Sequence, residues 1–268
     1  MTPDDEALIG RLVPHAPTDY HRLNPLTKLT AAVVVTIGAI ALGGYVAPLA
    51  LLALIVVPSA AVAGLLPRVV RLGVLVSLPI VISVVLVSVF TRTGTTVLFD
   101  VGPFDVTVEG ADFAAQTAIR LIVMAMALVL FGLTTPAREL VADLERRGVS
   151  PRVTFALAAS LEAVPALIQR GRTVVAAQRA RGLDTEGSVG ARLRGIGPMA
   201  VPVLLSTLAE VEERSLALEA RGFGRAGRRE PLWAPADSSA QGVVRWLLAG
   251  ALLGVVVARA GGALVGLP

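Results

Sequence analysis

The tripeptide Ala-Arg-Gly occurs twice in this chain, at residues 180–182 and 220–222, and each copy closes a stretch with helical periodicity. An arginine guanidinium can hold a carboxylate through two parallel hydrogen bonds, and the small residues beside it let a partner surface come close. The repeat therefore predicts two equivalent docking tips for a partner with two similar halves. The predicted docking residues are Ala180, Arg181, Gly182, Ala220, Arg221 and Gly222.

A plainer interpretation of the same repeat stays open on the sequence. Glycine is common just past a helix C-terminus because it takes a positive φ at little cost, and cations are favourable near that end. Two helices that simply end in Arg-Gly would produce the same pattern without any partner.

Few other residues offer chemistry. The chain has no cysteine, which excludes disulfides and thiolate metal sites, and its single lysine, Lys28, lies outside any Gly-x-x-x-x-Gly-Lys-Ser/Thr phosphate loop. His15 and His21 flank Asp19 and could hold a metal ion, but interfacial or solvated histidines are the favoured interpretation. We therefore predict no catalytic, cofactor-binding or metal-binding residue in this chain, and no enzyme.

Composition indicates the elements that must hold the repeat. Hydrophobic residues make up 54% of the chain, charged residues 16%, and the mean hydropathy is +0.74. The apolar residues form long runs without the alternation of a membrane β-barrel, so we predict an all-α integral membrane protein in a lipid bilayer. The net charge of +4 is carried almost wholly by arginine. This is typical of loops near anionic lipid, and no nucleic-acid partner is predicted.

About five apolar runs are candidates for transmembrane helices, at 29–42, 46–66, 72–90, 113–133 and 243–257. The first is short and the last is thin, so counts from four to six stay open. In the acidic loop that follows the third run, two short segments, 97–99 and 106–108, are predicted to pair as a hairpin. Arg120 falls inside the fourth run, and we expect it either to reach the outer interface or to pair with an acid in the bundle.

The placement of the basic residues predicts an orientation. If the first four spans alternate, Lys28 and nearly all the arginines fall on one side, because the loop 92–112 holds a single Arg. The positive-inside rule then places the N-terminus and the Arg-rich region in the cytoplasm of a multi-pass cell-membrane protein. Three parts are expected: 1–134 with the N-terminal segment and four spans, 135–242 as a cytoplasmic domain, and 243–268 as the C-terminal span.

Two amphipathic helices are predicted in the Arg-rich region, each too polar to span and each ending in Ala-Arg-Gly. The first covers 156–182 and is interrupted by Pro165, and the second covers 203–220 with glutamates on one face. The Gly- and Pro-rich segment 187–202 is predicted to be the turn between them. A helix pair on a lipid surface and a small helical domain with ordinary caps are alternatives, although the acidic second helix argues against anionic lipid.

A further helix is predicted to follow the fourth span. Thr135 is placed at its N-cap, Pro136 at its first helical position and Glu139 in its first turn.

Several segments resemble the transmembrane coupling subunit, or T component, of energy-coupling factor transporters, a family that includes membrane subunits of cobalt, nickel and biotin importers. Residues 21–29, His-Arg-Leu-Asn-Pro-Leu-Thr-Lys-Leu, are similar to the family's His-x-Leu-Asp-Pro-x-x-Lys-Leu motif, with Asn24 in place of Asp. Residues 134–140, Thr-Thr-Pro-Ala-Arg-Glu-Leu, resemble its Thr-Thr-Pro-x-x-x-Leu segment. Residues 178–182 and 219–223 look like its two Ala-Arg-Gly coupling motifs.

The resemblance implies a transport role without catalysis in this chain. In such transporters two cytoplasmic ATP-binding-cassette subunits form a dimer, and each of two coupling helices presents an Ala-Arg-Gly tip to one of them. A small membrane protein, the S component, captures a vitamin, cobalt or nickel. By this resemblance Arg181 and Arg221 dock the ATPases, which hold the ATP and magnesium, and the T component passes their motion to the S component.

Other functions are weighed against this one. A conventional ABC importer permease usually presents one coupling segment per subunit, so the double motif argues against it. A membrane-embedded enzyme would need acids or histidines within its spans, where the five runs contain none. A non-transport scaffold for soluble proteins is a further alternative. No residue decides the transported substrate, or whether the S component is dedicated or shared.

Overall fold

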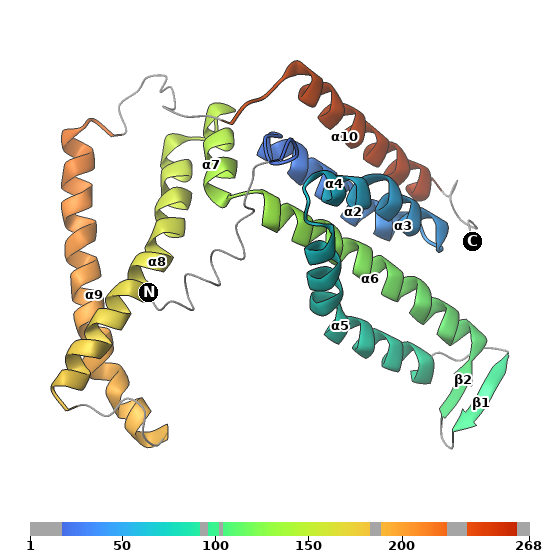
Figure 1. Ribbon diagram of the computed structural model, residues 1–268, viewed down its shortest axis with the longest axis horizontal. Coiled ribbons are helices and arrows are strands. Elements are labelled where there is room, and N and C mark those ends of the chain that lie inside the picture. The colour runs from blue at the N-terminus through green and yellow to red at the C-terminus, as the bar shows by residue number, and fades with distance from the viewer. Residues whose placement is uncertain (1–17, 92–95, 102–103, 183–188, 224–234, 262–268) are drawn as a thin grey trace. The chain divides into compact units, whose positions relative to one another are not determined.

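The computed structural model describes residues 18–91, 96–101, 104–182, 189–223 and 235–261 (Figure 1). The described chain is mostly helical, as predicted, with one two-stranded hairpin. Its elements are α2 (Pro25–Ala41), α3 (Val46–Leu51), the π-helical turn η1 (Leu52–Val56), α4 (Val57–Val62), α5 (Leu66–Thr91), β1 (Val97–Val101), β2 (Phe104–Thr107), α6 (Val108–Thr134), α7 (Ala137–Arg146), α8 (Pro151–Ala180), α9 (Val189–Ala220) and α10 (Ser239–Ala260).

The chain forms two compact units. The first comprises Met1–Leu140 and Pro235–Pro268 and contains α2 to α6 together with α10. The second comprises Val141–Ala234 and contains α8 and α9, while α7 begins in the first unit and ends in the second. Both Ala-Arg-Gly tripeptides therefore belong to one unit.

Four helices in the described part of the chain are long and apolar enough to cross a membrane: α5, α6, α8 and α10. Three of them match the runs predicted at 72–90, 113–133 and 243–257. α2 and the helical stretch Val46–Val62 are apolar but shorter. The prediction that the helix in α8 is too polar to span is wrong by length and composition, although α8 is the least apolar of the four. The chain is thus a multi-pass helical membrane protein.

Small and branched side chains hold the first unit together where α2, η1, α4, α5 and α6 meet. Val35, Val56 and Val123 are almost completely buried there. At Gly73 of α5, a Cβ atom would lie 2.5 Å from Cγ of Met126 and 3.1 Å from its Cα on α6. Glycine is required at this close approach, a common basis of helix packing in membranes.

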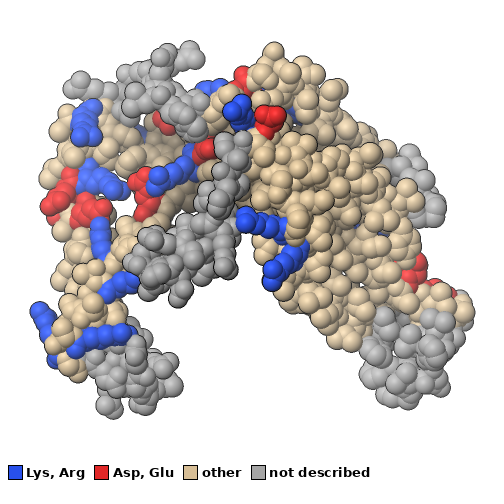
Figure 2. All heavy atoms as spheres, in the orientation of Figure 1, with Lys and Arg blue, Asp and Glu red and all other residues tan. Residues whose placement is uncertain are grey.

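The helices of the first unit also present apolar faces outward. Leu75 of α5 and Trp246 and Leu247 of α10 are exposed, Trp246 to 81%. In Figure 2 this unit shows broad areas without Lys, Arg, Asp or Glu. Continuous apolar surface of this kind is stable against lipid and unfavourable in water.

A short hairpin precedes α6. β1 and β2 pair antiparallel, with Val97 opposite Thr107 and Phe99 opposite Val106, so the two predicted segments do pair. α6 follows at once, because Thr107 Oγ1 accepts a hydrogen bond of 3.2 Å from the backbone N–H of Gly110. This N-cap starts the helix at Val108, five residues before the predicted span.

The second helix of the Arg-rich region is longer than predicted. α9 begins at Val189, so most of the segment 187–202, predicted to be a turn, is helical. The prediction gave the glycines and prolines too much weight, because one proline removes a single backbone hydrogen bond and long helices tolerate that loss. α8 likewise runs through Pro165 and begins at Pro151, where Ser150 Oγ accepts from the N–H of Val153.

Candidate coupling site

Lys28 joins two of the segments that carry the family resemblance. Its Nζ donates hydrogen bonds to the carbonyl of His21, at 3.0 Å, and to the carbonyl of Thr134, at 2.9 Å. The side chain is buried, and its ammonium lies 5.6 Å from the centre of the Tyr20 ring. Thr134 ends α6, so the ammonium also satisfies a helix C-terminus. No local pattern indicates this contact, because 106 residues separate Lys28 from Thr134.

Thr135 was predicted to be the N-cap of the next helix, and this prediction is wrong. α7 begins at Ala137, and the backbone N–H groups of Glu139 and Leu140 donate to the carbonyl of Pro136. The Thr135 hydroxyl is buried without a hydrogen-bond partner in the described part of the chain. Its backbone is extended, with φ −129° and ψ 100°, which is the usual conformation before a proline. The chain therefore leaves α6 extended and enters α7 one residue later than predicted.

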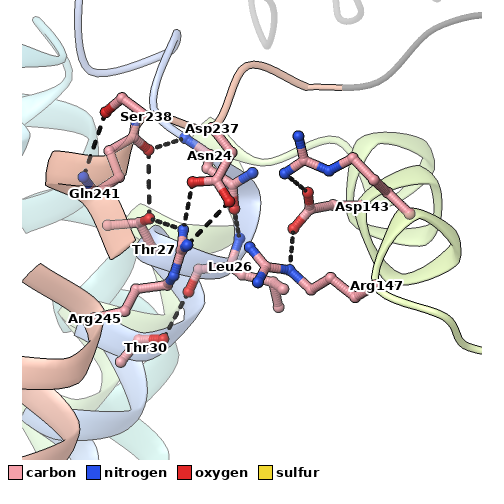
Figure 3. Close-up of polar contacts among 11 residues, drawn as sticks. Asn24, Leu26, Thr27, Thr30, Asp143, Arg147, Asp237, Ser238, Gln241 and Arg245 are labelled. Carbon is pink, nitrogen blue, oxygen red and sulfur yellow. Dashed lines mark hydrogen bonds and ion pairs between the residues drawn. The ribbon is translucent and has the colours of Figure 1, made fainter. Parts of the chain in front are cut away.

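A polar network ties α10 to the start of α2 (Figure 3). Arg245 and Asp237 form a bidentate pair with both N–O distances 2.9 Å, and Arg245 also donates to Thr27 Oγ1 at 2.9 Å. Gln241 Oε1 accepts from the backbone N–H of Asn24 at 2.8 Å. The Arg245 and Asp237 side chains are only 16% and 15% exposed, so removing one partner leaves a largely buried charge uncompensated.

Asn24 stands where the resembling family usually has Asp. Its Oδ1 accepts a hydrogen bond of 3.0 Å from the backbone N–H of Leu26 and so caps α2. Asn and Asp are about equally good N-caps. The substitution therefore keeps the cap without adding a second carboxylate to the network that holds Asp237.

The two Ala-Arg-Gly tripeptides close α8 and α9 in the same way. Both glycines have left-handed backbones, with φ +83° at Gly182 and +71° at Gly222. Each glycine N–H donates a 2.9 Å hydrogen bond to the carbonyl three residues earlier. A β-carbon would be strained at either position, so the glycines are explained by capping.

The arginines of the tripeptides are not explained by capping. Arg181 and Arg221 are both exposed, and their side chains make no ion pair or hydrogen bond within the described residues. Only their backbones take part in the helix ends. The caps therefore account for Gly182 and Gly222 and leave two guanidinium groups free to meet a partner.

The two helices contact each other at matching positions of the repeat. Arg170 of α8 and Glu210 of α9 form an ion pair, and each lies ten residues before the alanine of its own tripeptide. Arg170 also donates to Thr207 Oγ1, and Glu210 accepts from Arg214, both at 3.4 Å. Sequence analysis missed this pair, although aligning the two tripeptides would have placed Arg170 opposite Glu210.

A second contact joins the end of α9 to the start of α8. The ring centroid of Phe223, directly after the second tripeptide, lies 5.0 Å from that of Phe155 in the first turns of α8. The Arg221 tip therefore lies near the start of α8, whereas Arg181 lies at its end. Over 30 residues, α8 is about 45 Å long at 1.5 Å per residue, so the tips are on the order of 40 Å apart.

A groove of about 430 Å³ lies between α8 and α9. Apolar side chains such as Leu167 and Val211 line it, together with the Arg170–Glu210 pair. Beyond the groove both helices expose large apolar side chains, among them Ile168 and Leu204. The second unit thus combines charged contacts with apolar surface.

Asp143 is the most deeply buried acid of α7. Its two carboxylate oxygens accept from Arg146 Nη2 at 2.6 Å and from Arg147 Nε at 3.0 Å (Figure 3). The helix ends at Arg146, and Gly148, in the turn that follows, has φ +93°. Charge pairing and a glycine cap therefore fix the connection between α7 and α8.

The remaining candidates from the sequence are Arg120 and the two histidines. Arg120 Nη2 donates to Gln116 Oε1 at 3.1 Å, and no acid pairs with Arg120 among the described residues. His21 Nδ1 lies 2.8 Å from Thr18 Oγ1, while its Nε2 is buried without a partner there. His15 lies outside the described residues. Within those residues no cluster of His, Cys, Asp or Glu could hold a metal ion.

Comparison with known proteins gives a consistent family. The CbiQ family, described as cobalt transport protein, matches residues 18–232. The energy-coupling factor transporter transmembrane protein EcfT of Bacillus subtilis is 27% identical over 263 residues, which cover 93% of this chain and 97% of that protein. The EcfT protein of Heliobacterium modesticaldum is 32% identical over 243 residues, covering 82% and 85%.

A relative with a different name matches a shorter stretch. A putative ABC transporter ATP-binding protein of Bifidobacterium longum is 32% identical over 164 residues, which cover 56% of this chain and 21% of that protein. The family match from 18 to 232 includes the His-to-Leu segment, the Thr-Thr-Pro segment and both Ala-Arg-Gly tripeptides. This chain therefore belongs to the CbiQ family and is a T component of an energy-coupling factor transporter.

Proposed function

We propose that this T component docks one cytoplasmic ABC ATPase at each Ala-Arg-Gly tip and passes their ATP-driven motion to an S component. The observation that carries the proposal is the pair of exposed arginines, Arg181 and Arg221, on helix ends with the same backbone geometry. An ATPase dimer, with identical or related subunits, offers two similar surfaces. The tips fit such a partner because they are alike and well separated. The docking residues are those at 180–182 and 220–222.

The chain is proposed to be a non-catalytic subunit. ATP and magnesium bind to the ATPase subunits, and this chain holds no cofactor of its own. The name of the Bifidobacterium longum relative supports an ATP-binding partner, because that longer protein contains a segment similar to this chain.

The proposed membrane orientation follows the distribution of arginine. The N-terminus and the region 135–242 lie in the cytoplasm, and residues 1–134 and 243–268 supply the membrane part of a cell-membrane protein. The apolar surface of the first unit and of α8 and α9 supports contacts with lipid and with a membrane-embedded S component. The cargo is proposed to be a vitamin, cobalt or nickel.

The double substitution Arg181→Ala with Arg221→Ala tests the docking proposal. Leaving a partner carboxylate buried without its arginine costs about 2–5 kcal/mol per site, enough to lose the complex or its coupling. We expect normal membrane insertion, with loss of ATPase co-purification or of ATP-driven uptake. Arg68→Ala, at an exposed arginine of α5, is the matched control and should keep both. Undiminished ATPase association and uptake in the double variant would contradict the proposal.

Co-purification also separates the alternative functions. The proposed complex contains two ATPase chains and one further small membrane protein. A conventional permease would co-purify with ATPases but without that small membrane protein. A non-transport scaffold would co-purify with no ATPase pair and would support no uptake.

A further inference from the structure

Two arginine side chains from distant parts of the sequence converge beside the turn between α2 and α3. A Cβ atom placed on Gly43 would lie 3.7 Å from Nη2 of Arg120, on α6, and 3.9 Å from Nη1 of Arg259, on α10. Both guanidinium groups therefore lie within 4 Å of a single point next to the turn. The glycine leaves this point unoccupied by side-chain atoms of its own.

No carboxylate of the described residues pairs directly with either guanidinium group; Asp112 is linked to Arg120 only through the side chain of Gln116. Arg120 donates to the neutral amide of Gln116, and its Nε is buried without a hydrogen-bond partner there. Neither Arg120 nor Arg259 has an ion pair in the described part of the chain. Two like charges repel strongly where the dielectric constant is low, and a buried guanidinium nitrogen without a partner is unfavourable. A bound anion would remove both costs.

The surroundings indicate the depth of the site in the membrane. The Tyr45 hydroxyl donates a hydrogen bond of 2.5 Å to Asp112 Oδ1 beside the same turn, and tyrosines of this kind gather at the membrane–water interface. Arg259 lies one residue before the end of α10, where long cationic side chains reach the headgroup layer. Next to it, Val256 and Val257 are exposed apolar side chains. An anion bound here would meet two cations at headgroup depth, with apolar surface directly beside them.

We propose that Arg120 and Arg259 bind the headgroup phosphate of an anionic phospholipid above Gly43. The two guanidinium groups hold separate phosphate oxygens, and an acyl chain lies against the exposed valines of α10. The inference rests on the fold of the first unit and not on the coupling function. The proposed orientation would place this lipid in the leaflet away from the ATPases, and only that placement depends on the orientation.

Lipid retention measures this site directly. The full chain, with any partners that remain bound, is purified and titrated with phosphatidylglycerol or phosphatidylcholine, and bound lipids are counted by native mass spectrometry. Arg120→Gln and Arg259→Gln should each weaken one phosphatidylglycerol site by about five- to tenfold. Gly43→Ala should weaken the same site with both charges in place, because its methyl group meets only ordinary contacts and folding is preserved.

A control variant tests whether the effect is specific to this site, and competition with inorganic phosphate tests whether the bound anion is a lipid. Arg71→Gln, at an exposed arginine of α5, removes the same charge elsewhere and should leave this site unchanged. Equal losses in Arg71→Gln, or no loss in Arg259→Gln, would overturn the proposal. Inorganic phosphate should not displace the lipid, because it lacks the acyl chain. Displacement at millimolar phosphate would refute the lipid assignment and identify a site for free anions.

Discussion

The Lys28 ammonium serves two chain segments at once, holding the carbonyl of His21 and the last carbonyl of α6. The variant Lys28→Met keeps most of the side-chain length but removes the donor. We expect it to lower the free energy of unfolding by about 1–3 kcal/mol, because a buried carbonyl then lacks its partner. Thermal unfolding in detergent measures the effect. An unchanged transition temperature would show that water replaces the ammonium at Thr134.

His21 carries a pH dependence of known sign. Burial, and to a lesser degree the nearby Lys28 ammonium, lower the pKa of His21 below its usual value of 6.5. The folded state therefore keeps the imidazole neutral at a pH where the unfolded chain already binds a proton. Because the unfolded state binds more protons in that window, stability is full above about pH 6.5 and decreases as the pH falls below it.

The substitution His21→Asn tests this dependence, because its amide oxygen can still accept from Thr18 but does not titrate. The wild-type transition temperature should fall more steeply between pH 7.5 and 5.5 than that of the variant. Parallel curves for the two proteins would assign the acid sensitivity to other groups.

At the scale of elements, one glycine, Gly73, allows the close approach of α5 and α6. Gly73→Ala forces a methyl group against the Met126 side chain and backbone, so we expect a loss of about 1–3 kcal/mol in the free energy of unfolding. Gly132→Ala on α6 is the matched control, since nothing lies within 4 Å of its added Cβ, and it should be neutral or stabilising. Combining Gly73→Ala with Met126→Ala should recover part of the loss. Equal transition temperatures for the two glycine variants would contradict the close contact.

The crossing of α8 and α9 depends on the Arg170–Glu210 pair. Both side chains are partly exposed, 30% and 38%, so the pair contributes at most about 1 kcal/mol to stability. Its larger effect is expected on coupling, because Arg170→Glu sets two carboxylates against each other at the point where the helices meet. Uptake driven by ATP should fall in Arg170→Glu and recover in part when Glu210→Arg is added. Failure of the second substitution to restore any uptake would argue that the pair does not hold the crossing.

The elements differ in how far their sequence determines them. The runs of Val, Leu and Ile specify α5, α6 and α10, because length and hydropathy are local properties, and the glycine caps at 182 and 222 follow from local backbone preference. The contacts of Lys28 with Thr134 and of Arg245 with Thr27 could not be predicted, since they depend on which helices become neighbours. α9 was predicted too short because Pro198 and Pro202 were treated as breakers, whereas the surrounding helix tolerates them.

At the scale of the whole molecule, two physical demands are divided between two units. The first unit combines an apolar exterior with internal polar contacts, the hydrogen bonds of Lys28 and the ion pair of Arg245. This combination suits a rigid body in lipid. The second unit carries the charged crossing and the two arginine tips on long helices, which suits the transfer of a displacement. α8 belongs to the second unit but is apolar enough to cross a membrane. Whether α8 crosses the bilayer or stays on one side therefore decides on which side of the membrane each tip lies.

Single cysteines can test this topology, because the chain has none of its own. Glu109→Cys, Arg152→Cys and Arg179→Cys place a thiol at the start of α6, at the start of α8 and near the end of α8, each at an exposed position. With a membrane-impermeant maleimide on intact cells, we expect labelling only of Glu109→Cys, and labelling of the other two only after permeabilisation. The cysteine-free chain is the background control. If α8 crossed the bilayer, Arg152→Cys and Arg179→Cys would react from opposite sides. The tips at Arg181 and Arg221 could then not both meet a cytoplasmic ATPase dimer, because Arg221 lies near the start of α8.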